Sequence, residues 1–370
     1  MSLQLLLIGG GHAHLGVLEL LARRQRSGID VTLVSEHTTQ VYSGMLPGHV
    51  AGHYTLPECS IPLDPVAELA KADFVRGRVS GLDLRQRVAV TESGKVLPFD
   101  VVSIDIGPAA ESTVIPGLGH ALPVRPADKM LSAWYLMEQR FAGTPLPQVL
   151  AVLGGGPAGA EMVAALAHRA RESKVQLKPS IVTGQAGLLP GMPAAARRMM
   201  QERLTALGVR VIEADATAVR PSAVSIGGAG EFHADLIVAA LGASAARWPR
   251  ESGLQCDERG FIAVNQHLQS VSHPFVFAAG DCASMVGHPY PKSGVYAVRA
   301  GRPLGENLLR TLTRRRLVSW RPQKRALYLL SAGGKEAVGL WGPLVVEGPR
   351  VWRWKDRIDR KFIRRFNPRV

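Results

Sequence analysis

The sequence predicts an α/β protein built from two Rossmann-like domains, the second inserted in the first, with a smaller basic C-terminal segment. Two repeated patterns support this fold class. A short apolar run enters a glycine-rich turn at residues 5–11 and again at residues 149–156. An apolar run that ends in glycine, with an aspartate near its start, occurs at residues 100–107 and 234–242. Each pattern is typical of a buried parallel strand in a nucleotide-binding fold.

The first glycine turn has the spacing of a phosphate-binding turn. Gly9 allows the tight bend, and Gly11 lets backbone approach a pyrophosphate at the positive end of the following helix. Glu36 ends the next predicted strand, where an acid can bind a ribose hydroxyl. His14 stands where the pattern has its third glycine. We expect His12 and His14 to contact phosphate or flavin, with packing inside the turn as the alternative for His14.

The second turn, at residues 154–161, contains the complete pattern of three glycines. They are Gly154, Gly156 and Gly159, and Glu161 follows them. Two such turns indicate two bound nucleotides or one duplicated fold, and either turn can also occur without a ligand. The acid expected after the strand at residues 180–183 is missing, and Gly184 and Gln185 stand there instead. The sequence therefore does not choose between NADH and NADPH.

The composition sets the broad class. The chain has 370 residues, of which 46% are hydrophobic, enough for two α/β domains with their own cores. Cys59, Cys256 and Cys282 lie far apart in sequence, which argues against a disulfide framework and a zinc cluster, so we expect no metal site. No apolar run reaches the ~18 residues of a membrane span. We therefore expect a cytoplasmic protein.

The positive charge is concentrated near the C-terminus. From residue 310 onward, 17 Lys and Arg accompany 4 Asp and Glu, whereas the rest of the chain is nearly neutral. Within residues 351–366 an apolar stripe has helical spacing; it comprises Val351, Trp354, Ile358, Phe362 and Phe366. Such a basic helix suits an anionic membrane, so we expect a peripheral contact, with packing on its own domain or on a homodimer partner as alternatives. Nucleic acid is not expected, because no base-stacking module accompanies the charge.

The chain is predicted to return to the first domain near residue 246. An apolar strand at residues 274–283 ends in Gly280 and Asp281, and a helix starts near Gly294. The Asp281 carboxylate can accept a hydrogen bond from a ribityl hydroxyl of a flavin, and the helix would aim its positive end at the flavin ring. The predicted domains are 1–115 and 246–312 for the flavin domain, 116–245 for the inserted domain and 313–370 for the basic segment.

Further elements are predicted from local periodicity. They are strands at residues 73–79, 209–212, 328–330 and 344–346, a hairpin formed by residues 88–90 and 96–99, and helices at residues 127–141 and 195–207.

Taken together, the motifs resemble the FAD-dependent pyridine nucleotide–disulfide oxidoreductase superfamily over roughly residues 3–308. Within it, the chain is similar to a group near type II NADH dehydrogenases. It most resembles the flavoprotein domain that is fused to selenophosphate synthetase in some organisms. The segments that carry the closer likeness are residues 9–14, 42–48, 291–299 and 352–360.

The resemblance implies bound FAD, with NAD(P)H as electron donor. The residues that it places around FAD are Gly9, Gly11, His12, Glu36, Ser43, Val79, Gly107, Gly280, Asp281 and Gly294. Those that it places around NAD(P)H are Gly154, Gly156, Gly159, Glu161 and Gly242. Hydride transfer to flavin needs alignment and desolvation more than acid–base chemistry. Lys292 is the one candidate catalytic residue, as a cation near reduced flavin, with a surface lysine as the alternative.

The reaction that the resemblance implies is electron transfer from NAD(P)H through FAD to a small-molecule acceptor. No Cys-x-x-Cys or Cys-x4-Cys occurs, which excludes a redox-active disulfide, and Cys282 is expected to be a packed side chain. Val295 and Arg299 stand where type II NADH dehydrogenases carry glutamines, which weakens a quinone acceptor. A quinone, a small oxidant and a selenium or sulfur species all stay open. The alternative to an enzyme is a flavin-binding sensor or partner module with a vestigial second nucleotide fold.

Overall fold

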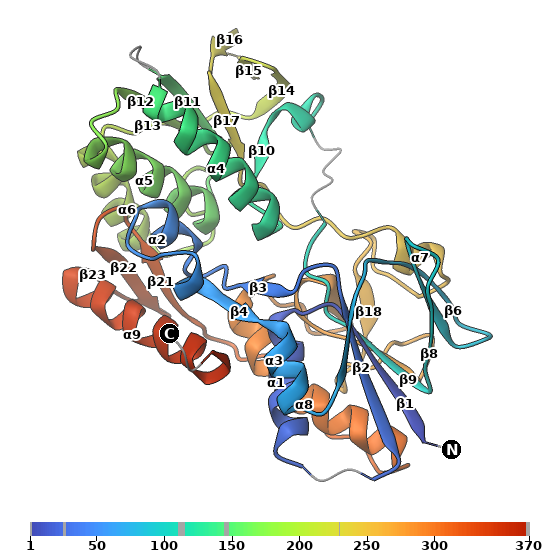
Figure 1. The fold of residues 1–370 in the computed structure, drawn as a ribbon. Coiled ribbons are helices and arrows are strands. Elements are labelled where there is room, and N and C mark those ends of the chain that lie inside the picture. Colours follow the sequence, from blue (N-terminus) through green and yellow to red (C-terminus); the bar gives the residue numbers. More distant parts are fainter. Residues whose placement is uncertain (1, 25–26, 110–114, 144–147, 229, 368–370) are drawn as a thin grey trace. The chain divides into compact units, whose positions relative to one another are not determined.

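The computed structural model describes residues 2–24, 27–109, 115–143, 148–228 and 230–367 (Figure 1). It confirms the predicted α/β class with parallel-strand sheets. The chain divides into two compact units, each discontinuous in sequence. Unit 1 comprises Met1–Gln40, Ser60–Ala109 and Ala243–Lys324, and unit 2 comprises Val41–Cys59, Ala110–Gly242 and Arg325–Val370. The outer ends of the predicted domains, residues 1 and 370, lie outside the described residues.

Unit 1 is built around a five-stranded parallel sheet in the order β19-β9-β1-β2-β5. Its strands are β1 (Leu3–Ile8), β2 (Ile29–Ser35), β5 (Asp73–Arg76), β9 (Val101–Ile104) and β19 (Val276–Ala278). Residues 5–8 of the central strand are almost fully buried, as expected for a parallel strand that is covered on both faces. The unit also contains α1 (His12–Ala22), α3 (Leu63–Leu69), α7 (Trp248–Glu251) and α8 (Gly294–Leu312).

Helices α1 and α8 pack closely at a glycine contact. A Cβ atom on Gly301 would lie 2.6 Å from the carbonyl oxygen of Ala13 and 3.0 Å from the Cα atom of Gly16. Only glycine permits this separation of the two helices. Because α1 begins at the first glycine turn, its packing on α8 fixes the direction in which the N-terminus of α1 points.

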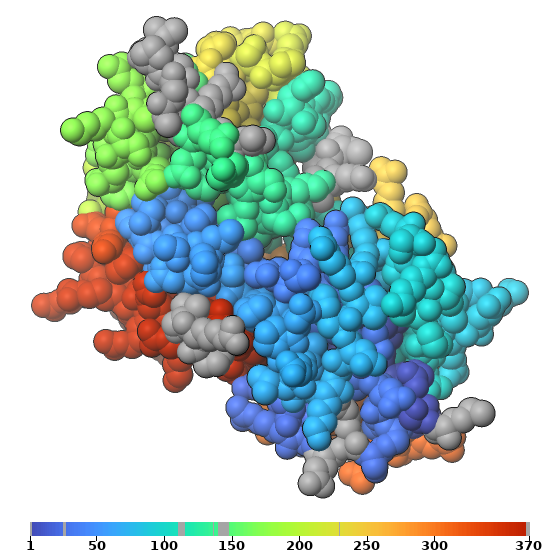
Figure 2. Space-filling view, in the orientation of Figure 1, coloured from blue at the N-terminus to red at the C-terminus, as the bar shows by residue number. Residues whose placement is uncertain are grey.

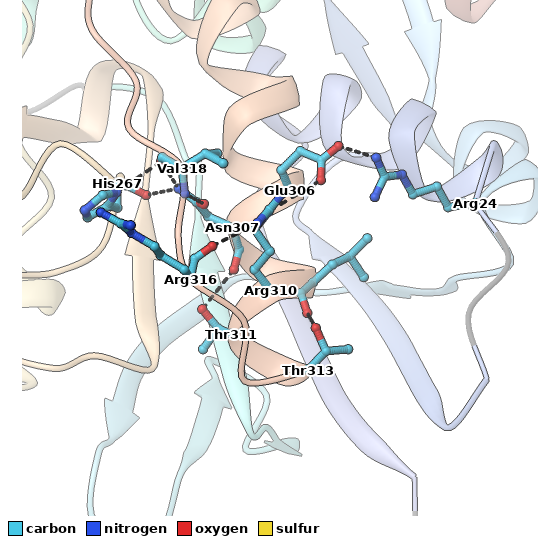
Figure 3. Close-up of polar contacts among 10 residues, drawn as sticks. Arg24, His267, Glu306, Asn307, Arg310, Thr311, Thr313, Arg316 and Val318 are labelled. Carbon is cyan, nitrogen blue, oxygen red and sulfur yellow. Dashed lines mark hydrogen bonds and ion pairs between the residues drawn. The ribbon is translucent and has the colours of Figure 1, made fainter.

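A buried asparagine ties the end of unit 1 to α8 (Figure 3). The side chain of Asn307 is fully buried and donates from Nδ2 to the carbonyl oxygens of His267 and Val318, at 2.8 and 2.9 Å. Its Oδ1 atom accepts the amide N–H of Val318 at 2.8 Å. One side chain thus satisfies three backbone groups and holds the segment after α8 against the helix.

Smaller sheets complete unit 1. Strands β6 (Val79–Asp83), β7 (Val88–Thr91) and β8 (Val96–Pro98) form an antiparallel sheet that contains the predicted hairpin. Strand β18 (Ile262–Val264) pairs in parallel with β20 (Ala283–Met285). Strands β3 (Thr39–Val41) and β4 (Ser60–Pro62) pair where the chain leaves and re-enters the unit.

Unit 2 repeats the plan with a parallel sheet in the order β10-β17-β11-β12-β13. Its strands are β10 (Leu122–Pro123), β11 (Gln148–Leu153), β12 (Leu177–Val182), β13 (Arg210–Ile212) and β17 (Leu236–Ala239). Helices α4 (Ala127–Gly143), α5 (Pro157–Glu172) and α6 (Ala194–Ala206) belong to it. The prediction missed a small antiparallel sheet of β14 (Ala216–Arg220), β15 (Ala223–Ile226) and β16 (Gly230–His233), whose strands have only four or five residues each.

The C-terminal residues pack with unit 2 and do not form a separate segment. Strands β21 (Leu327–Ser331), β22 (Ala337–Trp341) and β23 (Leu344–Gly348) form an antiparallel sheet, which α9 (Pro349–Phe366) follows. Leu330, Val338 and Leu340 share a hydrophobic core with α5 and α6. The prediction missed β22 because Gly339 interrupts its apolar pattern. A Cβ atom there would lie 2.9 Å from Val351 Cγ1, so the glycine lets α9 pack on the sheet.

A short segment from the N-terminal half also belongs to unit 2. Residues 41–59, which the prediction assigned to the flavin domain, contain α2 (Leu46–Val50). Leu46 and Val50 are buried in the same hydrophobic core as α5. The segment therefore packs on the second nucleotide fold, although its two flanking strands lead back to the first.

Candidate functional site

The turn between β1 and α1 has the geometry that its glycines predict. Gly9 has a φ of 93°, and α1 begins directly after Gly11, so the free N–H groups of its first turn face the end of the sheet. An unexpected acid meets them there. The buried carboxylate of Asp105, just after β9, accepts the N–H groups of Ala13 at 2.8 Å and His14 at 3.0 Å.

Asp105 fills the space in front of two predicted flavin-binding glycines. A Cβ atom on Gly11 or Gly280 would overlap its carboxylate. Burial raises the pKa of Asp105 to about 7; the nearby charge of Asp281 acts in the same direction, and the N–H groups of Ala13 and His14 oppose it. Sequence reasoning missed this residue, although an acid inside an otherwise apolar strand end was a visible signal.

His14 is part of the frame of the turn. Its ring is fully buried, with Nδ1 2.6 Å from the carbonyl oxygen of Gly9 and Nε2 2.8 Å from Ser103 Oγ. Burial lowers its pKa to about 4, so the ring is neutral at physiological pH. The packing alternative therefore holds for His14: where the usual pattern has a small glycine, this chain braces the turn with an imidazole.

The other residues predicted around FAD lie mostly in unit 1. Glu36 is exposed after β2, 3.8 Å from Arg78, where a ribose can reach it. Val79 begins β6, His12 begins α1, and Gly280 and Asp281 form the short 3₁₀ helix η3 (Gly280–Cys282) after β19. Gly107 and Gly294 border open space. A helix N-terminus, an exposed acid and two open backbone positions fit a flavin dinucleotide.

Ser43 departs from this set. It is exposed and lies in the segment that packs within unit 2, whereas the other predicted flavin residues belong to unit 1. The prediction treated the residues after β2 as a continuation of the flavin domain, and the structure assigns them to the second fold.

Lys292, the predicted catalytic residue, is a partly buried lysine just before α8. Its Nζ atom donates to the carbonyl oxygen of Ala283 and lies 4.1 Å from the ring centre of Phe261. Burial lowers its pKa, and Asp281 counteracts this effect. It is therefore a positioned cation in the unit that carries the flavin residues, and the surface-lysine alternative does not apply.

The three cysteines are free thiols. Cys282 is buried, with its Sγ atom 3.1 Å from the carbonyl oxygen of Ala279. Burial raises its pKa to about 12 and that of Cys59 to about 12 as well. Protonated, buried thiols are poor nucleophiles, so the structure supports the packing interpretation of Cys282.

The turn between β11 and α5 in unit 2 is open where the first turn is filled. Gly154 has a φ of 117°, and Gly159 packs directly on the carbonyl group of Gly154. A Cβ atom on Gly156 would meet nothing within 4 Å. The strand register makes Ala240 the counterpart of Asp105, so this position in unit 2 carries a methyl group in place of a carboxylate. Gly242 also borders open space.

Glu161, predicted to contact NAD(P)H, is half-buried. Its carboxylate accepts the amide N–H of Ser331 in β21 at 2.8 Å. Burial raises its pKa to about 7, which Lys355 counteracts. The contact links α5 to the C-terminal sheet of unit 2.

The acid that is missing after β12 is supplied from the end of β13. The exposed Asp215 accepts the amide N–H of Gln185 at 3.2 Å. A Cβ atom on Gly184 would lie 3.1 Å from Asp215 Oδ1, and one on Gly187 would lie 3.5 Å from Glu213 Oε1. Two carboxylates thus stand where the pattern places its ribose-binding acid. The sequence pattern could not find them because it looks for the acid on β12 itself.

A buried ion pair within α9 is hydrogen-bonded to residues 41–59 of unit 2, which lie beside α9 in Figures 1 and 2 (residues 41–59 in blue, α9 in red). Lys355 and Asp359 are 6% and 4% exposed and lie 2.6 Å apart. Lys355 Nζ also donates to the carbonyl oxygen of Gly44 at 2.6 Å, and Tyr42 is hydrogen-bonded to Asp359. Burial opposes the charge of Lys355, but Asp359 and Glu161 raise its pKa. The segments 42–48 and 352–360, separate motifs in the sequence, therefore meet here.

The buried face of α9 differs from the predicted apolar stripe. Val351 and Phe366 are buried, whereas Trp354 and Ile358 of the same stripe are 44% and 39% exposed. Lys355 was predicted on the polar face, but it points inward. Its ammonium group donates hydrogen bonds there to the carboxylate of Asp359 and the carbonyl oxygen of Gly44. In the part of the chain that the structure describes, no helix combines the length and the apolarity that a membrane crossing requires.

Comparison with known proteins extends these observations. The sequence profile of the pyridine nucleotide-disulphide oxidoreductase family matches residues 3–301. Ferroptosis suppressor protein 1 of Homo sapiens is 26% identical over 284 residues, which cover 73% of this chain and 71% of that protein. NADH dehydrogenase-like protein YutJ of Bacillus subtilis (strain 168) is 23% identical over 358 residues, 94% of this chain and 96% of that protein. The structure of NDH2 from Plasmodium falciparum in complex with NADH has a TM-score of 0.82 at 14% identity and covers 98% of each chain, which shows a shared fold.

Proposed function

The chain belongs to the pyridine nucleotide-disulphide oxidoreductase family, and we propose that it carries electrons from NADH through FAD to a quinone. It is an NADH dehydrogenase-like oxidoreductase whose cofactor is FAD. The observation that carries the proposal is the pair of glycine turns, each at the start of a long helix, one in each unit. Bound FAD supplies the chemistry, the acceptance of a hydride and the release of its electrons.

Different residues of unit 1 would each hold a different part of FAD. Glu36 would bind the adenosine ribose, the start of α1 the diphosphate, and Asp281 a ribityl hydroxyl. Lys292 would stabilise negative charge on the reduced ring, since its burial strengthens its field. Residues in these roles orient the cofactor and balance its charge, and none of them transfers a hydride.

Unit 2 would bind NADH in preference to NADPH. Its open glycine turn leaves the N-terminus of α5 free for a diphosphate. Asp215 and Glu213 beside Gly184 would bind the hydroxyls of the adenosine ribose and repel the 2′-phosphate of NADPH. The proposed preference for NADH therefore rests on Asp215 and Glu213, which are distant in sequence from the end of β12, where the pattern expects an acid.

Anaerobic mixing of the yellow holoprotein with NADH, and separately with NADPH, tests the proposal. Fast bleaching of the flavin absorbance by NADH, with slower bleaching by NADPH, is the expected result. Retained FAD that neither nucleotide reduces would overturn the dehydrogenase function and favour a flavin-binding sensor or partner module.

A quinone is the acceptor that we propose. The three cysteines are free and form no disulfide that could relay electrons, which favours direct transfer from the reduced flavin to an external acceptor. Steady-state oxidation of NADH with a quinone in liposomes, compared with a water-soluble dye and with selenium and sulfur oxidants, tests this. A higher kcat/KM with a selenium or sulfur species would support the likeness to the flavoprotein domain fused to selenophosphate synthetase.

We propose that the protein works in the cytoplasm and touches the membrane through α9. The exposed Trp354 and Ile358 lie among basic residues that are exposed on the same helix: Arg350, Arg353, Arg357, Lys361, Arg364 and Arg365. Sedimentation with anionic liposomes, which W354A/I358S should weaken and neutral liposomes should not support, tests this contact. Light scattering of the same samples would detect the alternative, a homodimer formed through this helix.

A further inference from the structure

We propose that Asp105 takes up one proton when FAD binds, so that the affinity for FAD falls as the pH rises. The inference rests on the proposed flavin function and adds to it a residue that the family pattern does not assign. It also makes flavin retention, and not the chemical step, the pH-sensitive property of this protein.

Asp105 and a flavin diphosphate would accept hydrogen bonds from the same backbone N–H groups. A Rossmann turn binds phosphate through the free N–H groups at the start of its first helix. In unit 1, the N–H groups of Ala13 and His14 already donate to the Asp105 carboxylate, at 2.8 and 3.0 Å. That carboxylate also occupies the space in front of Gly11, the backbone position expected to face the diphosphate. Cofactor binding would therefore bring a second anion next to a buried first one.

The charged and titratable neighbours of Asp105 do not neutralise it. On α1, His14 is neutral, because burial lowers its pKa to about 4. On the segment after β19, Asp281 adds negative charge, and Cys282 is a neutral thiol whose pKa burial raises to about 12. Before α8, burial raises the pKa of Tyr290, which is therefore neutral as well. The cation on this side is Lys292, which is held by the Ala283 carbonyl group and faces Asp281.

A proton on Asp105 removes the conflict. A neutral carboxyl group still accepts an N–H hydrogen bond with one oxygen and offers its own O–H group to a phosphate oxygen. Burial has already raised the pKa of Asp105 to about 7, so the proton is available near neutral pH. The second fold differs at this position: Ala240 stands where the first fold has Asp105, and a Cβ atom on Gly156 would meet no described atom within 4 Å.

The test measures FAD binding by the full-length protein at pH 6, 7, 8 and 9. The holoprotein is diluted, and the fluorescence of released FAD gives Kd at each pH. For a pKa near 7, Kd should rise about tenfold from pH 6 to pH 8 and approach a decade per pH unit above that. D105N should show little dependence on pH and should bind FAD more tightly than the wild type at pH 9. A D105N protein that keeps the wild-type slope would overturn the proposal.

A control variant locates the effect. D100N changes an acid of the same unit that bonds backbone at the other end of β9, and it should keep the wild-type slope. If D105N fails to fold, a direct measurement remains. FAD added to flavin-depleted wild-type protein at pH 8 in weak buffer should take up about one proton per FAD bound, as read by a pH indicator. Binding without proton uptake would refute the inference, whereas a wild type that binds no FAD would refute the flavin function itself.

Discussion

The two nucleotide folds of this chain share one frame and differ at the place where a ligand would enter. In each fold an aspartate anchors the first strand: Asp100 accepts the N–H of Gln4 at 2.7 Å, and Asp235 accepts the N–H of Val149 at 2.8 Å. The repeated aspartate of the sequence pattern therefore has a structural role in both folds. It fixes the position of a strand and does not reach a cofactor.

The difference lies at two positions around the first helix. Where unit 1 has Asp105 and His14, unit 2 has Ala240 and Gly159. In unit 1, side chains that are hydrogen-bonded to backbone fill the turn, whereas in unit 2 a Cβ atom on Gly156 would meet no described atom within 4 Å.

The largest effect is expected at the buried ion pair of α9, which belongs to unit 2. Replacing Lys355 with methionine leaves the buried Asp359 carboxylate without its cation, which should lower the free energy of unfolding by about 3–5 kcal/mol. Urea denaturation followed by circular dichroism measures the loss. R357M, on the exposed face of the same helix, is the matched control and should change stability by less than about 0.5 kcal/mol. Equal losses of stability for the two variants would show that the ion pair does not stabilise the packing of α9.

A pair of glycine variants tests the open cradle of unit 2. In G159A the new methyl group overlaps the carbonyl oxygen of Gly154, so the turn must move, at a cost of about 3 kcal/mol or more. In G156A the methyl group meets no protein atom within 4 Å and the φ of −71° suits alanine, so stability should change by less than about 1 kcal/mol. Thermal unfolding measures both. G156A should nevertheless raise the KM for NADH, because its methyl group enters the space of the diphosphate; an unchanged KM would contradict the proposed NADH site.

The braced turn of unit 1 should respond to acid. The folded-state pKa of His14, about 4, lies below its ordinary value of 6.5, so the unfolded chain binds the proton more readily. Stability from His14 is therefore present above pH 6.5 and is lost as the pH falls towards 4, by about 2–3 kcal/mol. H14Q keeps two hydrogen-bonding groups without a titrating ring. The free energy of unfolding of the wild type minus that of H14Q should therefore decrease over this range, and a constant difference would rule out a neutral, buried ring.

The smallest effect is expected at the acids that replace the missing one in unit 2. D215A should lower the preference for NADH over NADPH, as the ratio of kcat/KM values, by about tenfold, or about 1.4 kcal/mol. Stopped-flow reduction of the flavin by each nucleotide gives the ratio. E231Q removes another exposed acid of the same unit, on β16, and should leave the ratio unchanged. If D215A matches the wild type, the carboxylate does not contact the ribose.

Local patterns predicted the elements of both folds, and long-range contacts decided what the sites contain. The strand–turn–helix signals at Gly9 and Gly154 depend on neighbouring residues and were read correctly, as were the ranges of α4, α6 and β13 within a few residues. Asp105 is 92 residues from the N–H group of Ala13 that it binds. No periodicity connects residues at such separations.

The same limit applies to α9. Helical spacing alone placed Trp354 and Ile358 in one apolar stripe with Val351 and Phe366, and it left open whether a membrane or the protein covers that stripe. The inward position of Lys355 depends on the carbonyl group of Gly44, 311 residues earlier, and on Asp359 one turn later. A buried lysine can be predicted only when its partners are known, since the cost of its burial depends on them.

The contact between Lys355 and Gly44 also sets the order in which this protein can be completed. A ribosome makes the chain from its N-terminus, and domains generally fold as their residues emerge. Residues 41–59 emerge early, yet the helix that holds them through the hydrogen bond from Lys355 to Gly44 is among the last parts of the chain to be made. Unit 2 therefore stays unfinished until synthesis has passed residue 359. We expect the nascent protein to depend on chaperones during that interval.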